Sequence, residues 1–409
     1  TITFSAAISA CEKGGQWQQA LRLLEFMRCS GVPANTITYN AAISACAKGA
    51  HWQQALLLVE DMQVKGIPTD NITYSAAISA CEKGKQWYRA LQMMDEMQTK
   101  GIPANTVTYN AAIHACGSSG QWPYALLLMD KMDVNGIPKD TITYTATINA
   151  CEKGGQWQLA IRIFQDMLAN GITANTITYN AAITACEQGA QWRWALELLM
   201  DMQSKGIPAH TLAYNSVISA CAKAGEWQRA LHLLEEMTAL GIAVNALTYT
   251  MVINACGRVG QWQWILNLMD RMKPRWVCAS ASVYRAAICA CTEGGQWQRA
   301  LWLLKDMQAN GLPMDGDTYN AAMKACKQGM QWQRALQLLD QAQANGIEVD
   351  ESLYDDVLSA CEQCGQWQYA LRLLKNRPRM STHAATISLD ATIRRAFCCK
   401  LPIHASSAA

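Results

Sequence analysis

Hydrophobic residues recur along this chain in two helical stripes, and the pattern returns every 35 residues. The first stripe follows the i, i+3, i+4, i+7 spacing of one helix face and comprises Phe4, Ala7, Ile8 and Cys11. The same spacing resumes after a Gly-Gly break in Trp17, Ala20, Leu21, Leu24 and Met27. A Gly-x-Pro sequence, Gly31 to Pro33, then ends the second stripe. Each stretch therefore predicts two short amphipathic helices joined by a tight turn.

Tryptophan and tyrosine give the period of this pattern, which contains no insertion or deletion. Tryptophan recurs at Trp17, Trp52, Trp87, Trp122, Trp157, Trp192, Trp227, Trp262, Trp297, Trp332 and Trp367. Phe4 of the first helix is followed at the same step by Tyr39, Tyr74, Tyr109, Tyr144, Tyr179, Tyr214, Tyr249, Tyr284, Tyr319 and Tyr354. Two short helices bury such stripes only by stacking on the next pair, so a fixed period of this size is typical of a solenoid. We expect an all-α fold, an α-solenoid of about eleven repeats.

The repeats are expected to occupy residues 1–385, and residues 386–409 are expected to form a tail that is a partial cap or disordered. Residues 272–280 lack the usual Gly-Ile-Pro closure, and the last repeat loses its closure at residues 376–379. The chain starts at Thr1, not at a Met, and Thr1 already lies inside the repeat pattern. We therefore expect that further N-terminal residues, with any targeting peptide, precede it.

The composition fits an ordered protein that forms a core, because 51% of its 409 residues are hydrophobic and 16% are charged. No stretch approaches the 18 consecutive apolar residues that a membrane-spanning helix requires. The formal net charge of +2 is low for a nucleic-acid-binding protein. The charge on one face decides phosphate binding, however, and not the total over the chain.

Eleven of the 17 cysteines occupy one position per repeat. They are Cys11, Cys46, Cys81, Cys116, Cys151, Cys186, Cys221, Cys256, Cys291, Cys326 and Cys361. Equivalent cysteines cannot form disulfides with one another if helices of successive repeats pack about 8–10 Å apart. We interpret them as small buried thiols of a protein in a reducing compartment.

Small hydrogen-bonding residues occupy one further position per repeat, on a side of the first helix distinct from its buried stripe. We call them reading residues, and they are Ser5, Asn40, Ser75, Asn110, Thr145, Asn180, Asn215, Thr250 and Asn320. A merely solvated helix face would vary among Lys, Glu, Gln and Arg. Restriction to Asn, Ser and Thr therefore indicates a position that contacts a ligand.

The residue that closes each unit is similarly restricted. These closing residues are Asn35, Asp70, Asn105, Asp140, Asn175, His210, Asn245, Ser280, Asp315 and Asp350. Asn and Asp are also ordinary helix N-caps and turn formers, which is the alternative interpretation. Capping does not by itself explain why Asp closes units opened by Asn, as in Asn40 with Asp70, whereas Asn closes units opened by Ser or Thr. Paired variation of this kind is what a two-residue base code would produce.

The unit TITYNAAISACEKGGQWQQALRLLxxMxxxGIPAN resembles the pentatricopeptide repeat, from Thr1 to about Arg377. It shares the Tyr-Asn opening, the Ala-Leu pair, the Met and the Gly-x-x-x-Asn/Asp ending. The tetratricopeptide repeat has a period of 34 residues and different landmarks. The resemblance implies a right-handed superhelix of repeats that binds single-stranded RNA, with the reading and closing residues of each repeat recognising one base.

The resemblance also implies which bases are read. Asn with Asp implies uracil, and Ser or Thr with Asn implies adenine, so the first five repeats would read 5′-AUAUA. Chemically, Asn reaches far enough for the smaller pyrimidine, whereas Ser or Thr leaves room for a purine. Asn215 with Asn245 suggests a pyrimidine, Thr250 with Ser280 adenine, and Asn320 with Asp350 uracil. Asn180 with His210, and Arg285 with Asp315, have no assigned base.

Aliphatic residues stand three positions before the reading residue in each of the first eight repeats. They are Ile2, Ile37, Ile72, Val107, Ile142, Ile177, Leu212 and Leu247. In the family that the chain resembles, such residues sandwich the bases; ordinary packing is the other interpretation, and both can hold. The pattern fails at Ser282, Asp317 and Ser352, so base binding is expected to weaken beyond the eighth repeat.

Basic residues recur beside the turn that follows the first helix. They are Lys13, Lys48, Lys83, Lys153, Lys223 and Arg258. We expect them to contact phosphates and to make the affinity depend on salt. A solvated surface lysine is the alternative.

No arrangement of catalytic residues is evident, and we expect no enzyme activity, cofactor, metal or small-molecule substrate. The isolated Cys361 and Cys364 pair has no second pair nearby, and no His-x-Glu with Pro-Cys-x-x-Cys signature of zinc deaminases occurs. The resemblance implies an adaptor in RNA processing, stabilisation, splicing or translation in the chloroplast or mitochondrion, with RNA-processing proteins as further partners. A protein-binding scaffold remains the alternative, and it would favour aromatic or charged anchors on the binding face.

Overall fold

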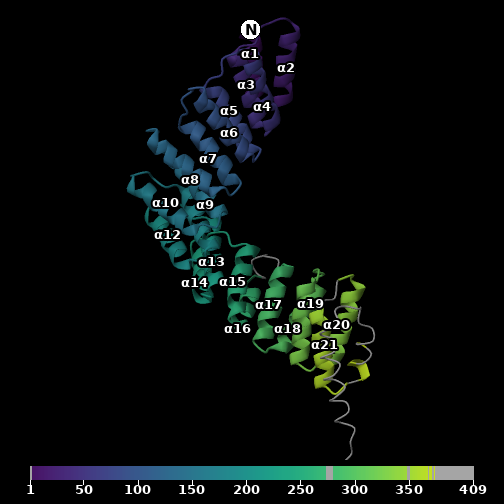
Figure 1. Cartoon of the computed structure of the whole chain (residues 1–409). Helices are drawn as coiled ribbons and strands as arrows, with labels where there is room; N and C mark the ends of the chain where they lie inside the picture. The colour runs from purple at the N-terminus through teal and green to yellow at the C-terminus, as the bar shows by residue number, and fades with distance from the viewer. Residues whose placement is uncertain (1, 273–279, 348–350, 367, 371–372, 374–409) are drawn as a thin grey trace, which may run out of the picture. The chain divides into compact units, whose positions relative to one another are not determined.

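The computed structural model describes residues 2–272, 280–347, 351–366, 368–370 and 373, and these residues form helices joined by short turns, with no strand among them. The first helices of the repeats are α1 (Ile2–Lys13), α3 (Thr36–Lys48), α5 (Asn71–Lys83), α7 (Thr106–Ser118), α9 (Thr141–Lys153), α11 (Thr176–Gln188), α13 (Thr211–Ala224), α15 (Ala246–Arg258), α17 (Ala281–Glu293), α19 (Gly316–Gln328) and α21 (Glu351–Gln363). The second helices are α2 (Trp17–Cys29), α4 (Trp52–Val64), α6 (Trp87–Thr99), α8 (Trp122–Val134), α10 (Trp157–Ala169), α12 (Trp192–Ser204), α14 (Trp227–Ala239), α16 (Trp262–Met272), α18 (Trp297–Ala309) and α20 (Trp332–Ala344). The predicted all-α fold of helix-turn-helix repeats is confirmed (Figure 1).

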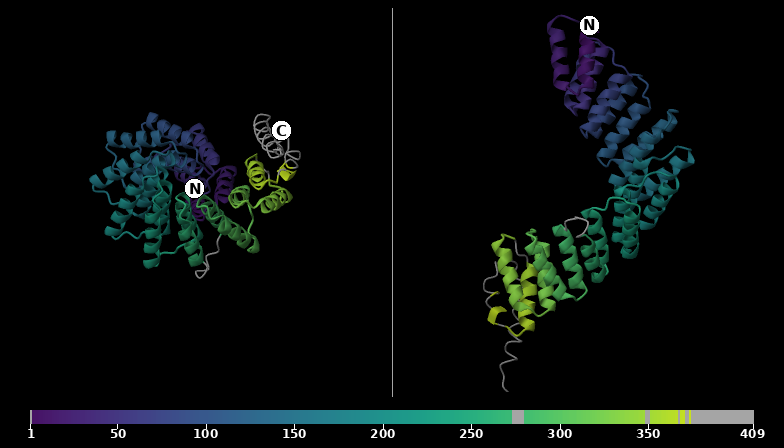
Figure 2. Two further views of the ribbon diagram at one scale, coloured as in Figure 1. Left: turned by 90° about the horizontal axis from the view of Figure 1, so that it is seen from below. Right: turned by 180° about the vertical axis from the view of Figure 1, so that it is seen from behind.

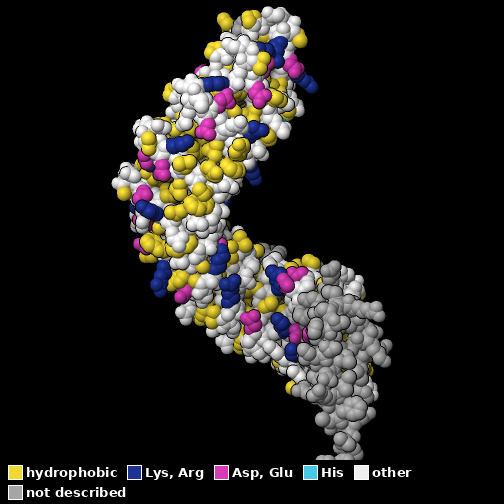
Figure 3. All heavy atoms as spheres, in the orientation of Figure 1, with side chains coloured by type: hydrophobic (Ala, Val, Ile, Leu, Met, Phe, Trp, Pro, Cys, Tyr) yellow, Lys and Arg dark blue, Asp and Glu magenta, His cyan; other side chains and the backbone are white. Residues whose placement is uncertain are grey.

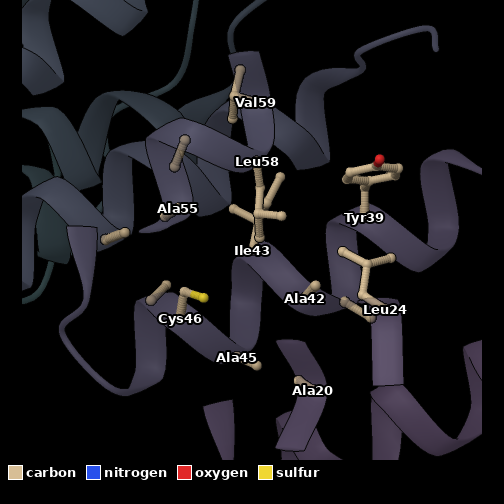
Figure 4. Packing of buried hydrophobic residues seen from close by; sticks show 14 of the residues in the cluster. Ala20, Leu24, Tyr39, Ala42, Ile43, Ala45, Cys46, Ala55, Leu58 and Val59 are labelled. Atoms are coloured by element: carbon tan, nitrogen blue, oxygen red, sulfur yellow. The ribbon is translucent and has the colours of Figure 1, made fainter. Parts of the chain in front are cut away.

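The predicted stripe of the first helix is the buried face of each repeat. In α3, the side chains of Tyr39, Ala42, Ile43 and Cys46 are fully buried. They face Ala20 and Leu24 of the preceding α2 and Leu58 of α4, so that each core is shared between neighbouring repeats (Figure 4). This sharing is why no repeat buries its apolar surface alone.

The buried tyrosines of the second and third repeats, Tyr39 and Tyr74, keep their hydroxyl groups at the polar edge of the core. The Tyr39 hydroxyl donates to Asp61 Oδ2 at 2.6 Å, and Lys65 Nζ lies 3.3 Å from the same hydroxyl oxygen. Tyr74 makes the equivalent bond to Glu96 at 2.9 Å. A buried hydroxyl group needs such a partner, because leaving it unpaired would cost free energy.

Of the ten second helices that the structure describes, nine end in a left-handed glycine, as the Gly-x-x closures of their repeats predict, and α16 is the exception. Gly66 has φ +66°, and the Ile67 N–H donates to the Met62 carbonyl at 2.9 Å, which is the bond pattern of a Schellman cap. A side chain at this φ would be strained, so glycine suits the position. The chain then turns directly into the first helix of the next repeat.

From α1 to α13 and from α15 to α21, first helices of successive repeats lie side by side. From α2 to α12 and from α16 to α20, each second helix contacts the first helices of its own repeat and of the next. Alanines allow the close approach: Ala41 and Ala45 of α3 are 6% and 0% exposed between neighbouring first helices. These small side chains therefore lie where the first helices of neighbouring repeats pack.

The chain divides into two compact units, Thr1–Ala224 and Gly225–Ala409. The first contains α1 to α13 and the second α14 to α21, and within each unit the helix pairs follow one another in chain order (Figure 2). The repeat cysteines from Cys46 to Cys361 are buried, and all cysteines in the described part of the chain are free thiols. Burial raises the pKa of the Cys46 thiol to about 11 and that of Cys116 to about 12, as expected for inert core thiols.

Several sequence predictions lie outside the described residues. The altered closures at 273–279 and 376–379, the tail at 386–409 and the closing residue Asp350 belong to this group. Among the helices that are described, none is both long and apolar enough to cross a membrane.

Candidate functional site

The closing residues are helix N-caps. Asn35 Oδ1 accepts hydrogen bonds from the Thr38 backbone N–H at 3.0 Å and from the Thr38 hydroxyl group at 2.7 Å, at the start of α3. The closing residues whose side chains cap the next first helix in this way are Asn35, Asp70, Asn105, Asp140, Asn175, Asn245 and Asp315. The capping interpretation is therefore correct for these seven residues. Ser280 makes no such bond.

In repeat 2, the reading and closing residues contact each other directly. Asn40 Nδ2 donates to Asp70 Oδ1 at 3.0 Å, across the boundary between α3 and α5. The Thr73 hydroxyl group lies 2.6 Å from Asn40 Oδ1 and 2.8 Å from Asp70 Oδ1, so its single proton is directed at one of these two oxygens. The three side chains form a closed cluster in which the carboxylate faces the amide nitrogen and the hydroxyl faces the amide oxygen.

The same cluster recurs two repeats later. Asn110 Nδ2 donates to Asp140 Oδ1 at 3.1 Å, and the Thr143 hydroxyl group donates to Asn110 Oδ1 at 2.6 Å.

Burial by itself would raise the pKa of the Asp70 and Asp140 carboxyl groups. Hydrogen bonds from the following Thr and from the reading Asn outweigh burial, and the pKa of each lies below its ordinary value. Both closing aspartates are therefore negatively charged acceptors at neutral pH.

In repeats 1, 3 and 5, whose reading residue is Ser or Thr, the threonine equivalent to Thr73 is used in a different way. Ser5 Oγ lies 3.1 Å from Thr38 Oγ1, and Ser75 Oγ lies 2.8 Å from Thr108 Oγ1. Thr145 and Thr178 form the third such pair, at 2.7 Å. The shorter side chains reach the threonine hydroxyl, whereas the closing Asn is engaged through its Oδ1 atom.

These contacts give the paired variation a structural cause that the sequence did not reveal. An Asn reading residue can donate to an Asp carboxylate, as Asn40 does to Asp70. Both types of closing residue cap the helix through their Oδ1 atom. The other terminal atom of the side chain is therefore what differs: it is an Nδ2 donor in Asn35 and an Oδ2 acceptor in Asp70. The pairing therefore serves the fold, and it also changes the hydrogen-bonding pattern at each repeat boundary.

The reading residues are more buried than the sequence suggests. Asn40, Asn110 and Thr145 are only 7–8% exposed, because the first helix of the following repeat packs beside them. The closing residues Asn35 and Asn105 are exposed. The closing residue is therefore the more accessible half of each pair.

The later repeats depart from this arrangement. Asn180 Oδ1 and Asn320 Oδ1 are buried and have no hydrogen-bond partner among the described residues. The Thr250 hydroxyl donates to the Ala246 carbonyl of its own helix, at 2.7 Å. Arg285, which stands at the reading position, pairs with Asp315 at 3.0 Å and with Asp317 at 3.1 Å. Two further closing residues precede first helices and are exposed: His210 before α13 and Asn245 before α15. The reading residue Asn215 lies within α13 and is 6% exposed.

The structure reveals one position that the sequence interpretation missed. We call the third residue of each repeat the third-position residue, and in repeats 2 to 6 its hydroxyl group lies within hydrogen-bond distance of the reading residue of the repeat before. It is Thr38, Thr73, Thr108, Thr143, Thr178, Thr248 and Thr318 in seven repeats, and Ala213, Val283 and Leu353 in three others. The signal was a threonine repeated at the 35-residue step, but only the structure shows that this hydroxyl bridges two repeats.

The predicted aliphatic row is exposed. The exposed fraction is 88% for Ile2, 64% for Ile37, 62% for Ile72, 63% for Val107, 55% for Ile142, 64% for Ile177, 60% for Leu212 and 53% for Leu247. Packing within the described chain therefore does not account for these residues. Exposed large apolar side chains in a regular row are unusual on a solvated surface and indicate contact with a ligand or partner.

The basic residues beside the first turn are also exposed, and two of them form ion pairs. Lys48 lies 3.3 Å from Glu12, and Lys223 lies 3.2 Å from Glu187. Exposed pairs of this kind contribute little to stability and leave the lysine available to a phosphate. On the face of the first unit seen in Figure 3, Lys and Arg are dispersed between hydrophobic side chains and do not gather into one patch.

No group of three or more His, Cys, Asp or Glu side chains in the described ranges is arranged to hold a metal ion. At the boundaries between the first seven repeats, the arrangement is instead one polar pair beside one exposed aliphatic residue. Such a set can bind a planar group edge-on with the polar pair and cover its face with the aliphatic side chain.

These boundaries define a helical-repeat protein with one potential ligand contact per repeat. Sequence comparisons identify its family. The model of the PPR repeat family matches residues 1–48, 34–83, 104–153, 139–188 and 209–258, which together make more than half of the chain. A second model, described as PPR repeat, matches residues 72–102 and 177–207, and one described as pentatricopeptide repeat-containing protein matches residues 247–377. The chain belongs to the PPR repeat family. No curated protein matches it.

Solved structures with the same fold include the pentatricopeptide repeat protein PPR10 from maize. That crystal structure matches 97% of this chain with a TM-score of 0.59 at 22% identity, and this chain spans 58% of the maize chain. PPR10 in complex with an 18-nt psaJ RNA element matches with a TM-score of 0.48 at 20% identity, over 97% of this chain and 59% of that chain. The PPR domain of Arabidopsis thaliana protein-only RNase P 1 in complex with tRNA matches with a TM-score of 0.39 at 14% identity, over 46% of this chain and 95% of that domain.

Proposed function

We propose that this chain binds single-stranded RNA, with one base at each repeat boundary. The main observation in support is that a reading residue, a closing residue and an exposed aliphatic side chain occur together at these boundaries. This group of three recurs every 35 residues. PPR repeats recognise one base per repeat through two or three side chains, and family membership therefore supports the same use here. The Watson–Crick edge of a base offers donors and acceptors to the polar pair, and its faces offer flat apolar surface to the aliphatic row.

The chemistry of the polar pairs supports the base assignment 5′-AUAUA for the first five repeats. In repeat 2, Asn40 retains one amide N–H and one oxygen lone pair beyond its bonds to Asp70 and Thr73. Uracil presents an acceptor next to a donor, which this amide can satisfy. In repeats 1, 3 and 5, the shorter Ser or Thr leaves room for a purine, and the closing Asn adds donors for adenine.

We further propose that the protein acts by occupying its RNA as an adaptor and not by catalysing a reaction. Covering a run of eight to ten bases would block nucleases or secondary structure, or would position a processing, splicing or translation factor. By resemblance to the family, the site of action is the chloroplast or mitochondrion.

Fluorescence anisotropy with short labelled oligonucleotides tests this proposal. The protein should bind an RNA containing 5′-AUAUA more tightly than an RNA with the permuted core 5′-AAAUU, and more tightly than DNA of the same sequence as the first. Equal affinity for all three would contradict base reading. Binding of none of them by a protein with the helical circular dichroism spectrum of the fold would favour a protein-binding scaffold.

A further inference from the structure

The third-position residue provides a second anchor for the reading residue, beside the closing residue. In repeat 2, the Asn40 amide is held at both ends: its nitrogen by Asp70 at 3.0 Å and its oxygen by the Thr73 hydroxyl group at 2.6 Å. A rotation of this amide by 180° about χ2 would place its oxygen against the Asp70 carboxylate, which is unfavourable. The order of donor and acceptor that Asn40 offers is therefore fixed.

Repeat 6 lacks both anchors. Its reading residue is Asn180, its closing residue is His210 in place of Asp, and the third-position residue of the next repeat is Ala213 in place of Thr. Asn180 Oδ1 is consequently buried with no partner within the described part of the chain. Repeat 10 lacks the threonine anchor, because Leu353 is the third-position residue of the next repeat, and Asn320 Oδ1 is also buried without a partner among the described residues. The two orphaned oxygens thus coincide with two of the three places where the threonine is absent.

We infer that the third-position residue is a positioning residue that sets how strictly the preceding repeat discriminates between the two pyrimidines. This inference rests on the proposed function. Uracil presents O4 as an acceptor beside N3–H as a donor, and cytosine presents N4–H₂ as a donor beside N3 as an acceptor. An amide fixed by threonine matches one of these orders. The unanchored amide of Asn180 can turn to match either, so repeat 6 accepts uracil and cytosine alike.

Substitutions at Ala213 test the inference by adding one of the two missing anchors, the threonine hydroxyl group. Ala213→Thr supplies the hydroxyl group, and Ala213→Val supplies the same volume without it. Ala213 is 1% exposed, so the Val variant controls for any repacking that the larger side chain causes. Affinities are measured for RNAs that begin 5′-AUAUA and differ only in having U or C as the sixth nucleotide.

The wild-type protein should bind the U and C forms equally, and Ala213→Thr should prefer U by about fivefold, the value of one ordinary hydrogen bond. Ala213→Val should stay near equal affinity. A Thr variant without a preference, or a Val variant with the same preference, would overturn the inference.

The reverse substitution in repeat 2 separates this inference from the function on which it rests. In the same series, the wild-type protein should prefer U over C at the second nucleotide. Thr73→Val should reduce that preference by about fivefold, whereas Thr73→Ser, which keeps the hydroxyl group, should retain it. A wild-type protein without preference at this nucleotide would contradict base reading altogether. A wild-type preference that Thr73→Val leaves intact would overturn only the role of the third-position residue.

Discussion

Trp52 packs so closely against Gly84 that a Cβ atom on residue 84 would lie 2.3 Å from the Cδ1 atom of the indole. Trp52 begins α4, and Gly84 follows α5 of the next repeat, so this contact crosses a repeat boundary. The same relationship joins Trp157 to Gly189, also at 2.3 Å. The tryptophan that begins the second helix of one repeat and the glycine that follows the first helix of the next are therefore two halves of one stacking contact.

Gly84→Ala should destabilise the protein, because the added methyl group must displace the indole or the turn. Overpacking of this kind costs about 1–3 kcal/mol. Gly14→Ala is the matched control: Gly14 holds the same place in the first repeat, where the nearest atom to an added Cβ is the Ala10 carbonyl oxygen at 3.4 Å. Urea denaturation followed by circular dichroism should show a lower midpoint for Gly84→Ala alone. Equal midpoints for the two variants would show that the Trp–Gly contact does not stabilise the stack.

Asn40→Thr, with Asp70 unchanged, should move the preference of repeat 2 from uracil toward guanine. The shorter side chain makes room for a purine, and the Asp70 carboxylate can accept from the N–H groups on the guanine edge. Stability should be retained, because Thr145 at the equivalent position bonds to Thr178 at 2.7 Å and a Thr at position 40 can bond to Thr73 in the same way. Binding to RNAs with each of the four bases at the second nucleotide measures the change. A variant that still prefers uracil there would show that the pair is assigned wrongly.

Ile37→Ala should weaken RNA binding without lowering the stability of the protein. Ile37 is 64% exposed, so its truncation leaves no cavity, but a bound base would lose an apolar contact of about 1 kcal/mol, or about fivefold in affinity. Leu57→Ala is the control, since Leu57 is 54% exposed but lies on α4, a second helix. Titrations of both variants with the same RNA should separate them. If Leu57→Ala weakened binding as much as Ile37→Ala did, the aliphatic row would have no special role.

Lys83→Gln should reduce the salt dependence of RNA affinity. A lysine that neutralises one phosphate of a single strand contributes about 0.7 to the slope of log affinity against log salt concentration. Lys305→Gln removes another exposed lysine, from the second helix α18, and should leave the slope unchanged. Measurement of the dissociation constant at several salt concentrations gives both slopes. An unchanged slope for Lys83→Gln would assign Lys83 to the solvated surface.

The fold was predictable from the sequence because its information is local and repeated. The spacing of Tyr39, Ile43 and Cys46 defines one helix face, and all three side chains are fully buried in the structure. The glycine stops were equally direct: Gly66 has the positive φ that its place after a helix predicts. The same pattern of apolar and turn residues occurs in eleven repeats, and it favours no other architecture.

The candidate site was predictable only in part, because its hydrogen bonds join residues about one repeat apart. The restricted residue types identified Asn40 and Asp70, but nothing in the sequence showed that they bond to each other and to Thr73. The burial of Asn40 was also unexpected, since it depends on how closely the next first helix packs. An apolar residue at the exposed position of Ile37 could equally have belonged to the core, and only the structure distinguishes the two.

Selection of bound sequences from a random RNA pool, with single-stranded DNA as competitor, tests the central claim most directly. It asks for the bound sequence without assuming it, and it reports the base preference and the register of the repeats together. The account predicts enrichment of a core that reads AUAUA from 5′ to 3′, followed by positions of weaker preference. A folded, helical protein that enriches no sequence would contradict the account and would favour a protein partner for the exposed aliphatic row.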